Sequence, residues 1–263
     1  MPLIFSAIVP HSPVLIPSVG KDDTSHLAKT IDAYKTLNEN LYAAKPQTII
    51  VISSHKKNLD SAFSINLSEE YAGNFKSFGD FSPCKFYKND AQLSHHIREI
   101  LETKIPIKLF SENELEYGVS IPLYYLTEHL NDISIIPLHF SNLDYNCHFA
   151  LGQALKDILL STNKKAAVIA SADLSHALLK NSPETYSPDG AKFDKKLISL
   201  IRNKDIKNIT RISSDLVKKA MVYDFRAILI LMGILEEINY EPEILSYEFP
   251  FGVGYLTANF KIM

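Results

Sequence analysis

Residues 3–13, LIFSAIVPHSP, decide how this chain folds. The apolar run from Leu3 to Val9 predicts a buried β-strand, and Pro10 and Pro13 end that strand at once. His11 is therefore expected at the exit of a strand, in a loop that two prolines make stiff. By itself this histidine does not establish a site.

The same arrangement recurs twice along the chain. Residues 48–55, TIIVISSH, are an apolar run that ends in His55. Residues 166–171, AAVIAS, are another such run, and residues 173–176, DLSH, follow it and end in His176. An amphipathic helical pattern over residues 27–41 separates the first two runs, which predicts a right-handed crossover between parallel strands. His11 and His55 should then leave the sheet at the same edge, where open α/β sheets bind ligands.

The alternation of strand and helix patterns predicts a single α/β domain over residues 1–263, with a central, mostly parallel or mixed sheet flanked by helices on both faces. Its length suits one large domain. Further strands are predicted at residues 62–67, 107–110, 133–140, 243–247 and 254–261, and further helices at residues 90–101, 144–160, 190–202, 214–221 and 224–238.

Two segments are predicted to be irregular. Residues 69–87 contain glycines, a proline and several aromatic side chains, and indicate a long loop or lid. Residues 116–123, EYGVSIPL, indicate a turn that leads into a helix over residues 124–130.

Composition excludes several classes of function. The chain has 46% hydrophobic and 22% charged residues and a net charge of -3, which is ordinary for a soluble protein and argues against nucleic-acid binding. Two cysteines form neither a disulfide framework nor a thiolate metal site, as expected in a reducing compartment. The N-terminus shows no basic leader, and the longest apolar run is too short to span a membrane, so we expect a cytoplasmic protein.

A carboxylate completes the candidate site. Glu248 lies between the last two predicted strands, and two histidines with one carboxylate form the facial ligand set of non-haem Fe(II) enzymes. Each residue alone also has a purely structural interpretation: a loop histidine bonded to backbone, a solvated histidine, a helix cap or a surface acid. The expected meeting of His11, His55 and His176 at one sheet edge favours a site. His139, near a strand end, is interpreted as a core residue or a support for that site.

The motifs resemble one family. The chain is similar to the class III extradiol ring-cleavage dioxygenases, the LigB-type catalytic subunits, and especially to the stand-alone prokaryotic branch that accompanies the AmmeMemoRadiSam system; Memo proteins share this fold. The resemblance covers nearly the whole chain, in order. It is carried by residues 10–13 (PHSP), 53–55 (SSH), 118–123 (GVSIPL), 171–176 (SADLSH) and 246–255 (SYEFPFGVGY).

The resemblance implies Fe(II) held by His11, His55 and Glu248, with zinc or another divalent metal as a further option. It implies a small aromatic diol and O₂ as substrates, and His176 as the acid/base. The chemistry agrees, because three protein ligands on one face leave three positions for the two diol oxygens and O₂. A neutral histidine can then take and return a proton.

One departure from the family pattern leaves alternatives open. Many dioxygenases of this type carry a histidine where this chain has Tyr117, and a phenol can donate a hydrogen bond but is a poor base near neutral pH. A Memo-like metal-binding partner protein with little turnover is therefore the alternative, although Glu248 favours the dioxygenase. A zinc hydrolase would use the same ligand types. A homodimer or a companion protein is compatible with the sequence, and the apolar residues 224–238 favour a core helix over an interface.

Overall fold

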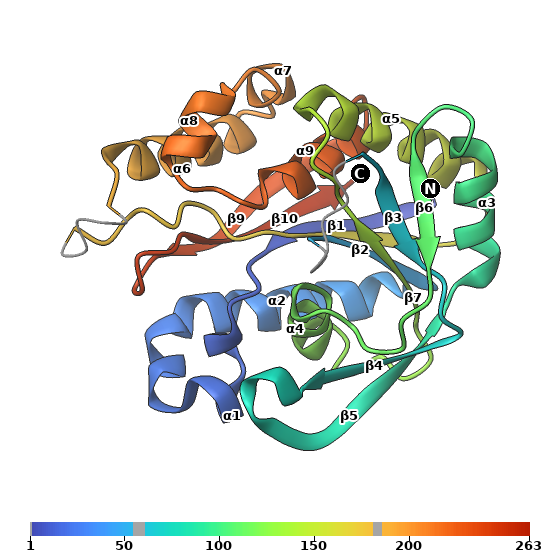
Figure 1. The fold of residues 1–263 in the computed structure, drawn as a ribbon, viewed down its shortest axis with the longest axis horizontal. Helices are drawn as coiled ribbons and strands as arrows, with labels where there is room; N and C mark the ends of the chain where they lie inside the picture. The colour runs from blue at the N-terminus through green and yellow to red at the C-terminus, as the bar shows by residue number, and fades with distance from the viewer. Residues whose placement is uncertain (1, 55–60, 181–185) are drawn as a thin grey trace.

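The fold is described by a computed structural model over residues 2–54, 61–180 and 186–263 (Figure 1). Ten strands form one mixed sheet in the order β4-β5-β7-β2-β8-β1-β10-β9, and β3 pairs with β6 and β7 beside this path. The strands are β1 (Leu3–Val9), β2 (Thr48–Ser53), β3 (Phe63–Asn66), β4 (Glu70–Phe75), β5 (Asp80–Asn89), β6 (Ile107–Phe110), β7 (Ser134–His139), β8 (Ala166–Ser171), β9 (Tyr240–Glu248) and β10 (Tyr255–Ile262).

Helices cover both faces of the sheet, as Figure 1 shows. One face packs on α2 and α4, and the other packs on α3, α5, α6 and α9. The helices are α1 (Pro17–Gly20), α2 (Ala28–Ala44), α3 (Ala91–Leu101), α4 (Tyr117–Leu126), α5 (Tyr145–Ser161), α6 (Pro188–Arg202), α7 (Ile206–Ile209), α8 (Ser214–Lys219) and α9 (Phe225–Leu235), with short 3₁₀ helices η1 (Pro13–Leu15), η2 (Lys21–Leu27) and η3 (Lys76–Phe78). The predicted fold class is confirmed.

The centre of the sheet is parallel and apolar on both sides. β1, β8, β2 and β7 are parallel neighbours, so their carboxyl ends share one edge of the sheet. Along β1, Ile8 packs in the core on one face while Ala7 and Val9 pack in the core on the other. The edge beyond Val9 is therefore built on the most buried part of the molecule.

The prediction of a loop or lid over residues 69–87 was wrong. These residues form an antiparallel hairpin, β4–η3–β5, in which Tyr71 lies opposite Tyr87 and both rings are buried. Such aromatic cross-strand pairs stabilise a sheet. Gly79 closes the turn with φ +85°, a conformation that side chains other than glycine rarely adopt. Tyr71, Phe75 and Tyr87 are thus part of the core, whereas Phe81 and Phe86 are exposed.

The predicted turn over residues 116–123 was also wrong, because α4 begins at Tyr117 and contains Pro122. Proline has no N–H to give to the carbonyl four residues earlier, which is that of Gly118. That carbonyl instead accepts a hydrogen bond from the hydroxyl of Ser171, at 2.5 Å. The helix therefore tolerates its proline, and a carbonyl becomes available next to the candidate site.

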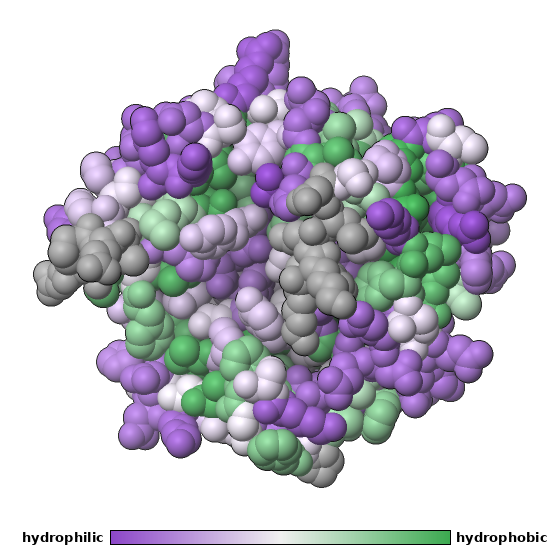
Figure 2. Space-filling view, viewed as in Figure 1, coloured by the Kyte–Doolittle hydropathy of each residue, from purple (hydrophilic) through white to green (hydrophobic). Residues whose placement is uncertain are grey.

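The surface is mixed in character. The face shown in Figure 2 carries hydrophilic side chains around its periphery, with hydrophobic groups between them. Among the described residues, every helix is too short or too polar to cross a lipid bilayer.

Candidate metal and active site

The loop after β1 holds His11 in a fixed position. The backbone N–H of His11 donates to Asp173 Oδ1 at 3.0 Å, and the carbonyl of Pro10 accepts from the Tyr34 hydroxyl at 2.5 Å. His11 is only 5% exposed. The sequence predicted a stiff loop here, and buried hydrogen bonds add to the restraint that the prolines impose.

Hydrogen bonding determines which nitrogen of His11 faces the cavity. Ser171 has one hydroxyl hydrogen, which it donates to the carbonyl of Gly118. Its oxygen lies 2.9 Å from His11 Nδ1 and must therefore accept from an Nδ1–H group. In the neutral ring, Nε2 then carries a lone pair and is available as a metal ligand.

The group facing that lone pair is a carboxylate. Asp224 Oδ2 lies 3.7 Å from His11 Nε2, and the Asp224 side chain is buried. Asp224 precedes α9 at the N-cap position, yet its carboxylate makes no capping hydrogen bond to that helix. It accepts instead from the backbone N–H of Asp173, at 3.3 Å. Burial raises the pKa of Asp224, and the negative charge of Asp173 raises it further.

Two acceptors that face each other across 3.7 Å without a shared proton require a cation between them or a proton on one of them. Two ligands of one first-row metal ion, each about 2.0–2.2 Å from it, lie about 3–4 Å apart. The positions of His11 and Asp224 therefore fit a bound divalent metal. Asp173 adds a second buried carboxylate beside them.

The full ligand set is not visible in the described part of the chain. Residues 2–54, 61–180 and 186–263 contain no group of three or more histidine, cysteine or acidic side chains that could hold a metal ion. His55, the second predicted ligand, lies outside these residues. Ser54 directly precedes it and lines the same cavity as His11.

His176 faces this cavity from the loop after β8. Its Nδ1 lies 3.1 Å from the carbonyl of Leu174, so Nδ1 carries the hydrogen and Nε2 is the free nitrogen of the neutral ring. The ring packs edge-on against Tyr223, with 5.0 Å between ring centroids. The structure thus brings together His11 and His176, as the sequence predicted.

The cavity has a volume of about 480 Å³ and is both aromatic and acidic. Tyr117 packs edge-on against His11 at a centroid distance of 5.6 Å, and Tyr223 lies beside His176. Burial, and then the charges of Asp224 and Asp173, raise the pKa of Tyr117, so its phenol stays protonated and can donate a hydrogen bond. The described lining contains acidic side chains and no lysine or arginine, which favours a cation.

The structure does not bring Glu248 to His11. Glu248 Oε1 accepts from the backbone N–H of Thr30 at 2.8 Å and from the Thr30 hydroxyl at 2.7 Å. Thr30 lies in the first turn of α2, whose own N-cap residue makes no side-chain bond, so Glu248 caps this helix from a distant strand. Among the described residues that line the His11 cavity, Glu248 does not occur. The reason is topological, since β10 separates β9 from β1.

His139 lies inside the fold. It is 1% exposed at the end of β7, and its Nδ1 lies 3.2 Å from Ser53 Oγ and 3.1 Å from the carbonyl of Ser54. It therefore supports the end of β2, where the candidate site begins.

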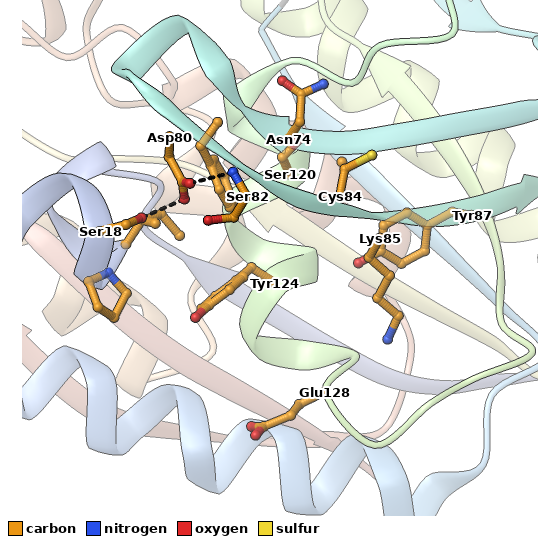
Figure 3. A pocket seen from close by; sticks show the side chains of 14 residues that line it. Ser18, Asn74, Asp80, Ser82, Cys84, Lys85, Tyr87, Ser120, Tyr124 and Glu128 are labelled. Atoms are coloured by element: carbon orange, nitrogen blue, oxygen red, sulfur yellow. Dashed lines mark hydrogen bonds between the residues drawn. The ribbon is translucent and has the colours of Figure 1, made fainter.

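A second cavity, of about 490 Å³, lies between the β4–β5 hairpin and α4 (Figure 3). Two of its three charged groups, Asp80 and Lys85, already have hydrogen-bond partners, and the third is Glu128. Asp80 accepts from Ser18 at 2.5 Å and from the N–H of Ser82 at 2.8 Å, and Lys85 donates to the carbonyls of Thr127 and Leu130. This cavity lacks the facing acceptors of the His11 cavity, so we place the chemistry at His11.

Sequence reasoning missed Asp224. The apolar residues 224–238 favour a core helix over an interface, and an aspartate before an apolar helix is ordinarily a cap. Asp90, Asp144 and Asp205 do cap their helices in this way. The sequence carries no signal that separates Asp224 from these three, because the difference lies in what packs against it.

Comparisons with known proteins identify the family of this chain. Residues 6–258 match the family described as the catalytic LigB subunit of aromatic ring-opening dioxygenase, and the chain belongs to this family. Its fold is that of the extradiol dioxygenases of this family.

Individual relatives are more distant. Protein CA_C1420 of Clostridium acetobutylicum is 27% identical over 258 residues, which are 94% of this chain and 55% of that protein, so the chain spans about half the length of that relative. The 4,5-DOPA dioxygenase extradiol of Beta vulgaris is 22% identical over 206 residues, 74% of this chain and 73% of the enzyme. The crystal structure of the uncharacterized protein JW3007 from Escherichia coli K12 shares the fold, with a TM-score of 0.66, 15% identity, and coverage of 97% of this chain and 99% of that one.

Proposed function

We propose that this protein is an Fe(II)-dependent extradiol-type dioxygenase that opens the ring of a small aromatic diol. The observation that carries the proposal is the pair of buried acceptors, His11 Nε2 and Asp224 Oδ2, 3.7 Å apart in a cavity that His176 also lines. Membership in the LigB family makes ring opening the expected chemistry for such a pair.

His11, Asp224 and His55 would hold the metal. This set replaces the predicted Glu248 by Asp224, because Asp224 faces His11 while Glu248 binds Thr30. Two histidines and one carboxylate are the ligand set that non-haem Fe(II) enzymes use with open positions. When bound, the ion makes the diol more acidic and holds it next to O₂.

His176 would act as the acid/base. Its Nδ1–H is bonded to the carbonyl of Leu174, so its Nε2 can accept the proton of a diol hydroxyl in the cavity. The rings of Tyr117 and Tyr223 would align a flat substrate between them, and the Tyr117 hydroxyl would donate a hydrogen bond to one of its oxygens. Tyr117 cannot replace the basic histidine of many relatives, since its pKa is raised.

That raised pKa also supports a second candidate, a metal-binding partner protein with little or no turnover. Such a protein would need the metal ligands but no second base. It predicts tight metal binding without O₂ consumption, and a stable complex with a companion protein.

The test is O₂ uptake by anaerobically iron-loaded protein with a panel of catechol-type diols. We expect uptake, and we expect His176→Ala to lower its rate about 10²–10⁴-fold while retaining the metal, because a general base contributes that much. His129→Ala is the matched control, because His129 is exposed and packs against Tyr42, away from the cavity. Tight iron binding without uptake from any diol would favour the second candidate, and equal rates in His176→Ala and wild type would refute the role of His176.

A further inference from the structure

A second ligand-sized groove lies between α6 and the end of β9, and its lining shares no residue with that of the His11 cavity. We call it the α6–β9 groove and define it by Lys195, Ile198, Arg202, Tyr247 and Phe249. Its volume is about 780 Å³, within the range of small-molecule sites. The rings of Tyr247 and Phe249 lie 5.8 Å apart at 40°, and Ile198 adds a buried aliphatic surface. The groove therefore offers an apolar wall for a flat or aliphatic body.

The charges on this groove are of one sign. Lys195 and Arg202 are seven residues apart on α6, so they lie on the same helix face as Ile198. The lining within the described residues contains no acidic side chain. Across that same part of the chain, no carboxylate lies within 4.0 Å of Lys195 or Arg202, whereas Lys192 on α6 pairs with Asp189. Lys180 also lines the groove, so three cations lie along it, and the two on α6 without a carboxylate partner favour an anionic group on the ligand.

The wall is held in place before any ligand arrives. The hydroxyl of Tyr247 donates to Asp194 Oδ2 at 2.6 Å, and Asp194 Oδ1 accepts from the N–H of Ser175 at 3.0 Å. Asp194 is fully buried in α6. The Tyr247 ring is thus anchored to both α6 and the loop after β8, so binding against it costs little ordering of side chains.

We propose that the α6–β9 groove binds a small amphipathic carboxylate, with its apolar body on Ile198, Tyr247 and Phe249 and its carboxylate on Lys195 and Arg202. The two cavities differ in charge, because the described lining of the His11 cavity is acidic and that of the groove is basic. In the metal-free protein, a ligand of this class would therefore select the groove over the His11 cavity. The proposal does not depend on the dioxygenase function.

The test is isothermal titration calorimetry of the full chain with 1-naphthoate and with its uncharged analogue naphthalene-1-carboxamide. We expect naphthoate to bind and the carboxamide to bind about tenfold more weakly, the effect of losing a charge-assisted contact. In Lys195→Ala/Arg202→Ala, naphthoate affinity should fall about tenfold to the level of the carboxamide, whose own affinity should not change.

Lys192→Ala/Lys196→Ala is the matched control, because it removes the same charge from exposed positions of α6 that do not line the groove. It should leave naphthoate binding unchanged. An equal loss in both double variants would show attraction to net charge alone and would overturn the proposal, as would the absence of naphthoate binding to wild type. Thermal unfolding of each variant checks that the fold is intact.

Discussion

Two carboxylates, Asp224 and Glu248, lie on opposite sides of the β1–β10 region, and their surroundings differ in kind. Glu248 has two donors from Thr30, at 2.7 and 2.8 Å. Asp224 is buried, has one N–H at 3.3 Å, and faces the lone pair of His11. The first carboxylate is satisfied by the protein, and the second is satisfied only when a cation or a proton joins it.

The difference indicates that a carboxylate is a candidate metal ligand when the neighbouring residues leave it with few hydrogen-bond donors. A carboxylate that caps a helix has no reason to bind metal, however suggestive its sequence context. Asp194 extends the comparison, since it is fully buried yet accepts from Ser175 and Tyr247. In the proposed site, the lack of hydrogen-bond donors therefore distinguishes Asp224 from other buried carboxylates, and burial alone does not.

The largest effect is expected for Asp224→Asn. Removing a direct ligand should weaken Fe(II) or Zn(II) binding by more than about a hundredfold, beyond the loss seen for groups that merely support a ligand. Competition titration with a metal-sensitive dye measures the affinity. Glu248→Gln is the matched amide control and should bind metal like wild type; if it loses metal as Asp224→Asn does, our choice of Asp224 over Glu248 is wrong.

Asp194 should make stability depend on pH. Burial raises its pKa from 3.8 to about 6, so in the range between these values the folded protein holds a proton that the unfolded chain has released. Unfolding free energy therefore falls as pH rises through this range, by about 3 kcal/mol from this group. Urea unfolding at about pH 4 and pH 7 measures this fall in the unfolding free energy. The fall should be smaller in Asp194→Asn, because the contribution of Asp194 is then absent. A pH profile identical to that of wild type would contradict this account.

Ser171→Ala should have a smaller effect on the metal. Without the hydroxyl, His11 Nδ1–H loses its acceptor and the ring is no longer held in one tautomer, which should lower metal affinity about tenfold or somewhat more. Nitrogen NMR of the metal-free protein should show Nδ1–H on His11 in wild type and a mixture of tautomers in the variant. Ser120→Ala is the control, because Ser120 lies in α4 and its hydroxyl donates to the carbonyl of Leu115 instead. A single unchanged tautomer in Ser171→Ala would contradict the proposal that the Ser171 hydroxyl fixes the tautomer of His11.

The smallest effect is expected for Glu248→Ala. The loss of the cap on α2 should lower the unfolding free energy by about 1 kcal/mol and leave metal affinity unchanged. A double-mutant cycle with Thr30→Val tests the contact, because the two losses should be less than additive if the side chains bond to each other. Full additivity would show that the Thr30 contact contributes nothing.

The parts of the fold that were predicted correctly are those with strong local signals. β1, β6 and β8 have the predicted boundaries, because short apolar runs bounded by turn residues or proline allow little else. The hairpin over residues 69–87 was missed, because its stability comes from the pairing of Tyr71 with Tyr87. α4 was missed because Gly118 and Pro122 signal a turn locally, while Ser171 satisfies the carbonyl that Pro122 leaves open.

The sequence by itself determined that histidines follow parallel strands and so share one edge of the sheet, because strand direction follows from the crossovers between them. It also determined family membership, since the motifs occur in order along nearly the whole chain. Only the tertiary structure showed that Asp224 faces His11, because in the sequence Asp224 has the pattern of a helix cap and the motifs favour Glu248 until the hydrogen-bond donors of both are known. Those donors come from residues far away in the chain, and only packing brings them into place.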